Sequence, residues 1–326
     1  MNPRWLPRTA RGTSALGATA LGTTLGMAAT ALLLGGCGAP DGSAASGASG
    51  SQTPSAGTIS IVTSTNVWGA VAKSVGGDAV TVRSFISEPS QDPHSFEASS
   101  TTLLAVSKSG LVIENGGGYD DFMDRMVEAS DSEATVINAV DASGRTAPSG
   151  GELNEHVWYD LPSVEKVADL IARELGKERP GEADAFASRA ADLKAEIETL
   201  VEQESRLKRQ VGGMRIGITE PVPLYLTEAA GLVNATPAEF SEAVEEGEDV
   251  SPSVLQETID LFADRQVAAL VYNEQTSGPV TEKVKASAQK AGIPIVPVTE
   301  TLPEGLDYVS WMRRNLTSLQ AAVAGE

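Results

Sequence analysis

The fold of this 326-residue chain is decided by residues 182–210, which read EADAFASRAADLKAEIETLVEQESRLKRQ. Ala, Glu, Leu and Lys dominate the stretch, and its apolar residues recur at spacings of three and four, which predicts one uninterrupted helix. At about 1.5 Å per residue, such a helix is about 40 Å long. Two glycines, Gly212 and Gly213, follow it. A helix of this length can run along the flank of a domain, so we expect it to connect two halves of the chain.

On both sides of this helix, short β-branched runs alternate with longer helical patterns, which predicts βαβ units and parallel sheets. Before the helix, strands are expected at 58–63, 79–86, 111–114 and 135–137, and helices at 67–75, 120–129 and 161–175. After it, strands are expected at 215–220, 267–272 and 293–298, and helices at 223–230, from 252 onward, at 280–291 and at 306–323. The predicted fold class is α/β: two lobes with parallel sheets flanked by helices, joined by one long rigid helix.

The expected organisation has five parts. They are a lipoprotein signal peptide (1–36), a lipidated cysteine with a flexible linker (37–57), an N-terminal α/β lobe (58–178), the linking helix (179–212) and a C-terminal α/β lobe (213–326). Each lobe has roughly one hundred residues, which is an ordinary size for a domain.

The first residues predict export. Three arginines and no acidic residue precede Cys37, and an apolar stretch rich in Ala and Leu ends in Leu34-Gly35-Gly36-Cys37. A basic start, a short apolar segment and small residues before the cut are typical of a secretory signal. Many Gly, Ser and Thr residues interrupt the apolar stretch, which argues against a membrane-spanning helix. Leu-Gly-Gly-Cys resembles a bacterial lipobox, so we expect Cys37 to carry a lipid.

Cys37 is also the only cysteine, so the chain can form no internal disulfide. The residues after it, 38–57, are mostly Gly, Ser, Ala and Pro with almost no large apolar side chain. Such a segment cannot bury enough surface to offset its ordering entropy, which predicts a flexible tether. A lipid anchor and a tether would hold the folded part at the extracytoplasmic face of the bacterial cell membrane.

The formal net charge of −20 makes nucleic acid and anionic substrates poor partners and favours cations. Removal of the three leader arginines would make the remainder more negative still. An acidic cluster lies at residues 239–249. We interpret it as a solvated edge, because blocks of like charge usually repel one another and stay hydrated; a cation-collecting role is the alternative.

The chain has only two histidines, and both stand in short, unusual surroundings. His94 lies in Asp92-Pro93-His94-Ser95-Phe96, and His156 lies in Asn154-Glu155-His156-Val157-Trp158. Neutral imidazole is the commonest side-chain ligand for a transition metal, although a lone histidine in a loop is more often a surface residue. The fixed φ of Pro93 and the apolar run after His156 favour ligands in both cases.

Two carboxylates stand where the expected strands of the second lobe end. Glu220 is the last residue of the first of these strands, and Glu300 ends the final one. Because ligands of open parallel sheets bind outside the carboxyl ends of the strands, we expect both to meet the histidines in the cleft between the lobes. Glu220 could equally be a turn residue. Glu274, at another strand end, competes with Glu300.

The set of His94, His156, Glu220 and Glu300 is chemically coherent. Two neutral imidazoles and two carboxylates carry two negative charges, which balance one divalent cation. Nitrogen with carboxylate oxygen suits Zn²⁺ and also Mn²⁺ or Fe²⁺.

These residues stand within longer motifs. The most specific are Asp92-Pro93-His94-Ser95-Phe96-Glu97, His156-Val157-Trp158 and Thr219-Glu220-Pro221. Taken together, the sequence from Thr58 to the C-terminus resembles the cluster A-I (cluster 9) solute-binding proteins of metal ABC transporters, a family of zinc- and manganese-binding lipoproteins. The resemblance implies a monomer that captures a divalent metal outside the cytoplasm and delivers it to an ABC permease in the membrane.

Carried over by position, His94 and His156 match the two histidine ligands of the family's N-terminal lobe. Glu220 stands where members have glutamate, aspartate or a third histidine, and Glu300 where most have aspartate. The two carboxylates resemble manganese- and iron-binding members, whereas intrinsic affinity follows the Irving–Williams order and favours Zn²⁺ over Mn²⁺. Zinc and manganese therefore both remain candidates.

Two other functions compete with this one. A metal-dependent extracellular hydrolase would need three protein ligands and an open position for water, which four side-chain ligands would close. An adhesin-like metal-binding surface lipoprotein is the other. The sequence contains no Gly-x-Ser-x-Gly motif and has few aromatic residues, at 5%. A non-enzymatic metal carrier is the function that we expect.

Overall fold

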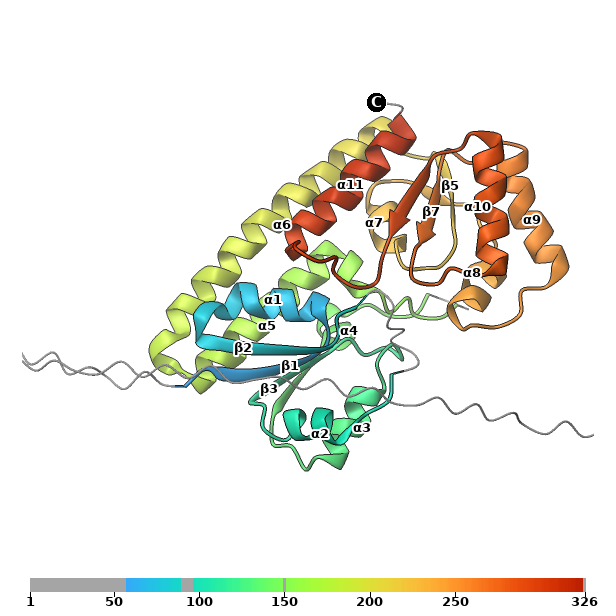
Figure 1. Ribbon diagram of the computed structural model, residues 1–326. Coiled ribbons are helices and arrows are strands. Elements are labelled where there is room, and N and C mark those ends of the chain that lie inside the picture. The colour runs from blue at the N-terminus through green and yellow to red at the C-terminus, as the bar shows by residue number, and fades with distance from the viewer. Residues whose placement is uncertain (1–56, 89–95, 149–150, 325–326) are drawn as a thin grey trace, which may run out of the picture. The chain divides into compact units, whose positions relative to one another are not determined.

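The computed structural model describes residues 57–88, 96–148 and 151–324. Its N-terminal lobe is built on four parallel strands in the order β2-β1-β3-β4 (Figure 1). The strands are β1 (Ile59–Thr65), β2 (Val80–Ile86), β3 (Leu111–Glu114) and β4 (Thr135–Asn138). The helical segments are α1 (Asn66–Gly76), η1 (Gly77–Ala79), α2 (Ser100–Val106), α3 (Phe122–Ala129), α4 (Ala139–Ser143), η3 (Val157–Tyr159), α5 (Leu161–Glu178) and η4 (Pro180–Glu182).

Both faces of this sheet are buried, as expected of parallel strands. Successive residues of β1 point to opposite faces: Ile61 packs in the core with α1 and α5, whereas Val62 packs with α2 and α3. Ile113 and Val112 of β3 divide in the same way. The run of β-branched residues seen in the sequence therefore reflects burial on two sides.

The C-terminal lobe repeats this plan with four parallel strands in the order β6-β5-β7-β8. The strands are β5 (Arg215–Ile218), β6 (Val233–Asn234), β7 (Leu270–Asn273) and β8 (Ile295–Val298). The helices are α7 (Leu224–Ala229), α8 (Ala238–Glu245), α9 (Pro252–Ala263), α10 (Pro279–Ala291) and α11 (Tyr308–Ala324). Ser251 caps α9, because its side chain accepts the backbone N–H of Val254.

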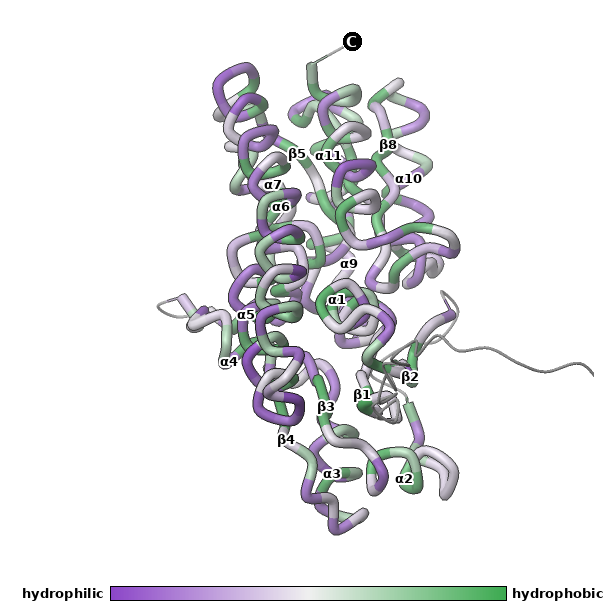
Figure 2. The backbone as a smooth tube through the Cα atoms, turned by 90° about the vertical axis from the view of Figure 1, so that its left-hand side faces the viewer, coloured by the Kyte–Doolittle hydropathy of each residue, from purple (hydrophilic) through white to green (hydrophobic). Residues whose placement is uncertain are grey.

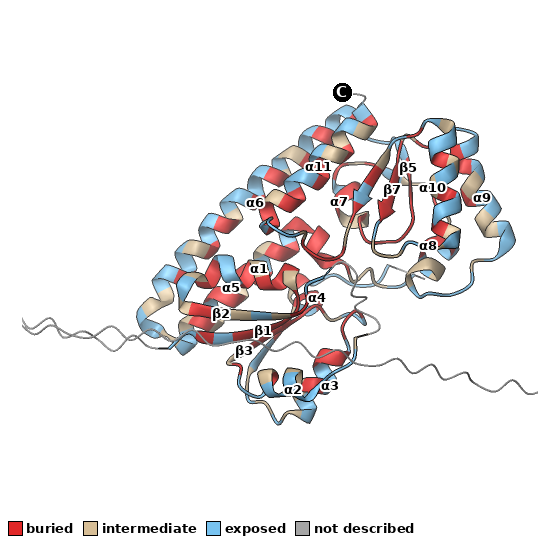
Figure 3. Cartoon of the chain, viewed as in Figure 1, coloured by how far each residue is buried: buried red, intermediate tan, exposed pale blue. Residues whose placement is uncertain are grey.

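The long helix α6 covers Ala183–Val211, 29 residues. Its buried residues recur every three or four positions, and Figure 3 shows them along its length. They are Phe186, Ala190, Leu193, Ile197, Leu200, Glu204, Leu207 and Val211. Figure 2 shows the matching pattern of apolar residues alternating with hydrophilic ones along the helix.

Helix α6 is more than a connector, because it shares one core with both lobes. It packs against α1 and α5 of the N-terminal lobe and against α7 and α11 of the C-terminal part. A single buried apolar cluster contains Ile61 of β1, Leu200 of α6, Ile216 of β5 and Val296 of β8. The two lobes are thus joined by continuous packing, and the described residues form one compact unit.

The structure corrects several expected boundaries. Strands β5 and β8 end at Ile218 and Val298, so Glu220 and Glu300 each lie two residues beyond a strand end instead of closing it. Helix α5 continues through Gly176 to Glu178. Four short elements were not predicted: α2, α4, β6 and α8. No helix in the described ranges is long and apolar enough to cross a membrane.

Candidate metal centre

His156 is placed by the loop that leads into η3. The ring is only 1% exposed, and its Nδ1 lies 2.8 Å from the side-chain oxygen of Asn154. The same oxygen accepts the backbone N–H of His156 at 3.1 Å. Because that oxygen can only accept, Nδ1 must carry the proton, and Nε2 therefore carries the lone pair that a metal ion requires.

Aromatic packing fixes the plane of this imidazole. The ring of Tyr119 meets it edge-on with centroids 5.8 Å apart, and the ring of Trp158 does so at 5.0 Å. Trp158 is fully buried, so the apolar residues after His156 anchor the loop in the core of the N-terminal lobe. A buried and oriented imidazole loses little freedom when it binds a ligand.

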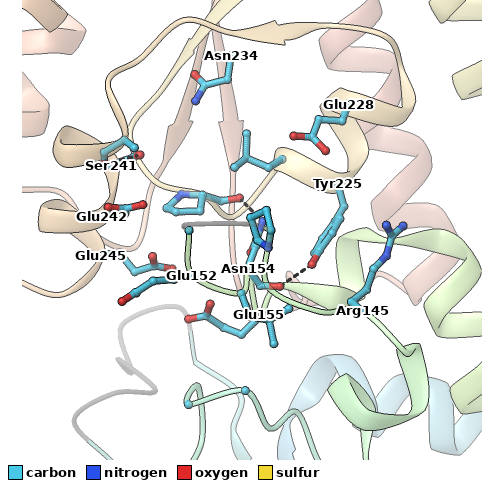
Figure 4. A pocket seen from close by; sticks show the side chains of 18 of the residues that line it. Arg145, Glu152, Asn154, Glu155, Tyr225, Glu228, Asn234, Ser241, Glu242 and Glu245 are labelled. Atoms are coloured by element: carbon cyan, nitrogen blue, oxygen red, sulfur yellow. Dashed lines mark hydrogen bonds between the residues drawn. The ribbon is translucent and has the colours of Figure 1, made fainter.

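Asn154 also joins the two lobes. Its side-chain N–H donates to the backbone oxygen of Pro221 at 3.1 Å, and its own backbone oxygen accepts the Tyr225 hydroxyl at 2.7 Å. Figure 4 shows both bonds. The amide that orients His156 is therefore bonded to the residue that follows Glu220.

Glu220 and Glu300 lie together in the C-terminal lobe, and both are almost fully buried, at 2% and 4% exposure. One amide group links them, because Nδ2 of Asn273 donates to Oε2 of Glu220 and, at 2.8 Å, to Oε1 of Glu300. Asn273 is the last residue of β7. Holding two buried carboxylates against one another is costly unless a cation compensates their charge or one of them keeps a proton.

Tyr119, a residue of the N-terminal lobe, contacts this carboxylate pair. Its hydroxyl donates to Oε2 of Glu300 at 3.1 Å, while its ring contacts His156. Burial, followed by the charge of Glu300, raises the pKa of Tyr119 well above its ordinary value, which keeps the hydroxyl protonated and able to donate. His156 and Glu300 are thus connected through one side chain.

Glu300 and Glu274, the two candidates that follow the last strands, differ in burial. Glu300 is buried, and its backbone N–H is held by the side-chain oxygen of Gln275 at 2.7 Å. Glu274 is exposed to solvent. The geometry therefore favours Glu300 as the residue that faces the cleft.

A carboxylate that the sequence analysis did not single out lies against the imidazole. Oε1 of Glu245, at the end of α8, lies 3.4 Å from Nε2 of His156. Among the described residues, Glu155, His156 and Glu245 offer ligand atoms that all lie within 4.8 Å of one another. Burial first, and then the charges of Glu155, Glu220 and Glu300, raise the pKa of Glu245 to about 9.

The interpretation of residues 239–249 as a solvated edge is therefore wrong for Glu245. The signal that could have identified it is helical spacing. Ser241, four residues earlier on α8, is buried, and residues four apart share one face of a helix. The remaining acidic residues of α8, Glu239 and Glu242, are exposed.

A cavity of about 990 Å³ opens beside these residues (Figure 4). Its lining includes six glutamates, namely Glu152, Glu155, Glu228, Glu242, Glu245 and Glu246. Arg145 is the only basic residue among the described ones that line it. It forms an ion pair with Asp160, with 2.6 Å between Nη2 and Oδ1. The cavity therefore presents a strongly negative approach to His156, which attracts cations.

Two predicted site residues fall outside this description. His94 and Cys37 both lie outside the described residues, as do the signal peptide and almost all of the linker. Asn273 links Glu220 to Glu300, and Tyr119 links Glu300 to the ring of His156. Among the described residues, the ligand atoms that lie within 4.8 Å of one another are those of Glu155, His156 and Glu245, and neither Glu220 nor Glu300 belongs to that group.

The chain has two lobes built on parallel sheets, and a buried imidazole and several carboxylates lie where the lobes meet. This arrangement is that of two-lobed α/β proteins that bind a ligand at the junction of their lobes. The sequence profile of the family of zinc-uptake complex component A, periplasmic (ZnuA), matches residues 61–322. The chain belongs to this family.

Named relatives agree with this assignment. The chain is 24% identical over 307 residues to the manganese-binding lipoprotein MntA of Halalkalibacterium halodurans, covering 90% of this chain and 95% of the relative. The laminin-binding protein Lmb of Streptococcus agalactiae has the same fold, with a TM-score of 0.70 at 23% identity over 82% of this chain and 99% of that one. FpvC of Pseudomonas aeruginosa, in complex with Mn²⁺, also has this fold, with a TM-score of 0.68 at 22% identity over 82% of this chain and 99% of that one.

The predicted family and the predicted fold class are confirmed. The family is one of metal-uptake components and not of enzymes, which decides against the metal-dependent hydrolase.

Proposed function

We propose that this protein is an extracytoplasmic solute-binding protein that captures one divalent transition-metal ion and delivers it to an ABC permease for import. The observation that carries the proposal is the pairing of Glu220 and Glu300 through Asn273, which the side chain of Tyr119 connects to the buried imidazole of His156. The manganese-binding name of the Halalkalibacterium halodurans relative and the zinc-uptake name of the family support it.

The proposed ligands are His94, His156, Glu220 and Glu300. Two neutral imidazoles with two carboxylates balance the charge of Zn²⁺, Mn²⁺ or Fe²⁺, so the bound ion leaves no net charge in the buried site. Asn273 and Tyr119 support these ligands without binding the ion themselves: they donate to the two different oxygens of Glu300 and so hold the plane of its carboxylate.

Release to the permease is proposed to depend on local movement. Because the apolar core runs from β1 through α6 to β5, a wide opening of the lobes would expose buried side chains such as Leu200. A handover requires only that the released state binds the ion more weakly, which displacement of one or two ligands achieves. Lipidation of Cys37 and the tether after it would keep the protein beside the permease.

The test is calorimetric titration of the purified protein with Zn²⁺ and with Mn²⁺, followed by metal analysis. We expect one equivalent to bind tightly to the wild type. His156→Ala and His94→Ala should each weaken binding by at least about a hundredfold, since each removes a ligand. Glu274→Gln is the matched control for Glu300→Gln, because Glu274 is an exposed carboxylate one strand away.

Wild-type protein that binds neither ion would refute the proposal. So would equal loss of affinity in Glu274→Gln and Glu300→Gln, because the effect would then come from net charge and not from ligation.

A further inference from the structure

We propose that Glu245 is a further ligand of the transported ion and the residue that shifts the preference of the site toward Mn²⁺ over Zn²⁺. The inference rests on the proposed function and extends it to a side chain from α8. It begins from the contact between Oε1 of Glu245 and Nε2 of His156, 3.4 Å apart.

Without a proton or a metal ion between them, Nε2 of His156 and Oε1 of Glu245 would present lone pairs to each other. Asn154 holds the proton on Nδ1, so the lone pair of Nε2 faces the carboxylate oxygen. That oxygen is buried and accepts no hydrogen bond within the described part of the chain. Two lone-pair atoms in such a contact need a positive species between them: a proton on the imidazole, a proton on the carboxyl, or a metal ion that displaces the proton.

The separation fits a shared metal ion. Ligand atoms about 2.0–2.2 Å from one ion, at angles between octahedral and tetrahedral, lie about 2.8–3.6 Å apart. The observed 3.4 Å falls in this range. Glu155 completes the group, because one ligand atom from each of Glu155, His156 and Glu245 lies within 4.8 Å of the other two.

Glu245 also stands where the acidic cavity meets the imidazole. It lines the cavity, comes from the opposite lobe to His156, and its side chain is only 15% exposed (Figure 4). An ion that enters through the cavity therefore reaches Glu245 together with His156.

The metal preference follows from the number and kind of donors. Among the described residues of the proposed site, His156 offers a nitrogen, and Glu220 and Glu300 offer carboxylate oxygens. A further carboxylate from Glu245 moves the donor set toward the oxygen-rich, octahedral coordination that suits Mn²⁺ and away from the tetrahedral coordination of Zn²⁺. The hydrogen bonds that Glu220 and Glu300 accept from Asn273 and Tyr119 offset part of the additional negative charge.

The experiment compares wild type, Glu245→Gln and Glu242→Gln by competition titration with Mn²⁺ and Zn²⁺ in the purified protein. Glu242→Gln is the matched control: it removes the same charge from the same helix and the same cavity, but Glu242 is exposed. We expect Glu245→Gln to weaken Mn²⁺ binding at least tenfold and Zn²⁺ binding less than threefold. Glu242→Gln should leave both within twofold.

Unchanged or tighter Mn²⁺ binding in Glu245→Gln would overturn the inference, because Glu245 would then serve only as the partner of a protonated imidazole. Equal losses in the two variants would also overturn it, by showing a general effect of charge. Both results leave the proposed function intact, since the wild type still binds. Wild-type protein that binds no metal would refute the proposed function and this inference together.

Discussion

Two asparagines arrange the charged groups of the site while remaining neutral themselves. Asn273 donates from one amide nitrogen to Glu220 and Glu300, and Asn154 fixes the tautomer of His156. Neither amide can gain or lose a proton in the ordinary pH range, so the arrangement does not depend on pH through them. Groups that orient metal ligands in this way typically matter almost as much as the ligands.

At this scale we predict that Asn154→Ala weakens metal binding by about 10–100-fold while one ion still binds. The imidazole remains present, but the proton is no longer held on Nδ1 and the ring can turn. Calorimetric titration with Zn²⁺ measures the loss. Asn234→Ala is the control, because Asn234 lines the same cavity and bonds to Thr236 instead. Full affinity in Asn154→Ala would contradict the assigned role.

The sequence predicted residues of this site only where a local pattern marked them. His156, Glu220 and Glu300 stood out by rarity and by their place after strands. Tyr119 and Asn273 could not be identified, because their partners are 181 and 27 residues away in the chain and only folding brings them together. Glu245 was concealed by its acidic neighbours, whose charge suggested a hydrated edge.

Among single elements, long periodic stretches were predictable, whereas several short ones were not. The spacing of apolar residues located α6 to within one residue at each end. Helix α2 begins with Ser and Thr, which have modest helix propensity, and it forms with a capping box between Ser99 and Thr102. Strand β6 has two residues, too few to show alternation.

Helix α6 contains one buried carboxyl, Glu204, among its apolar residues. Burial first, and then the charge of Asp160, raise its pKa from 4.5 to about 8. Tyr308 of α11 lies in the same region, since the charge of Glu204 contributes to raising the pKa of that hydroxyl. Asp160 itself is paired with Arg145 at 2.6 Å. Glu204 is therefore protonated in the folded protein at neutral pH.

We predict that the free energy of unfolding falls as pH rises from about 4.5 to about 8, because the folded state keeps a proton that the unfolded chain releases. Glu204→Gln should abolish this contribution and be more stable than wild type above pH 8 by on the order of 2 kcal/mol. Urea unfolding at pH 5 and pH 8.5 tests it. Glu202→Gln, an exposed neighbour on α6, should keep the wild-type dependence.

At the scale of the whole molecule, the shared core makes the two lobes one cooperative unit. Ile61, Leu200, Ile216 and Val296 belong to one buried cluster although they come from different lobes and the helix between them. The sequence predicted two lobes and a connecting helix, but not this continuity. It depends on which face of α6 meets α5, α7 and α11, and the pattern of α6 alone does not specify its partners.

We therefore predict that Leu200→Ala lowers the free energy of unfolding by about 2–5 kcal/mol in a single transition. The side chain is fully buried at the centre of α6, so the cavity affects both lobes. Far-ultraviolet circular dichroism and tryptophan fluorescence should report coincident unfolding curves. Two separated transitions, with only one shifted by the substitution, would contradict a common core.

The amide of Asn154 has one more consequence. Its oxygen sets the proton position on the imidazole, while its nitrogen is bonded across to the backbone of Pro221. Displacement of one half of the molecule against the other therefore strains the hydrogen bond that orients His156. If His156 binds the ion as we propose, even a shift too small to uncover the buried side chains would lower affinity, and disturbance of this one asparagine would be enough to begin release.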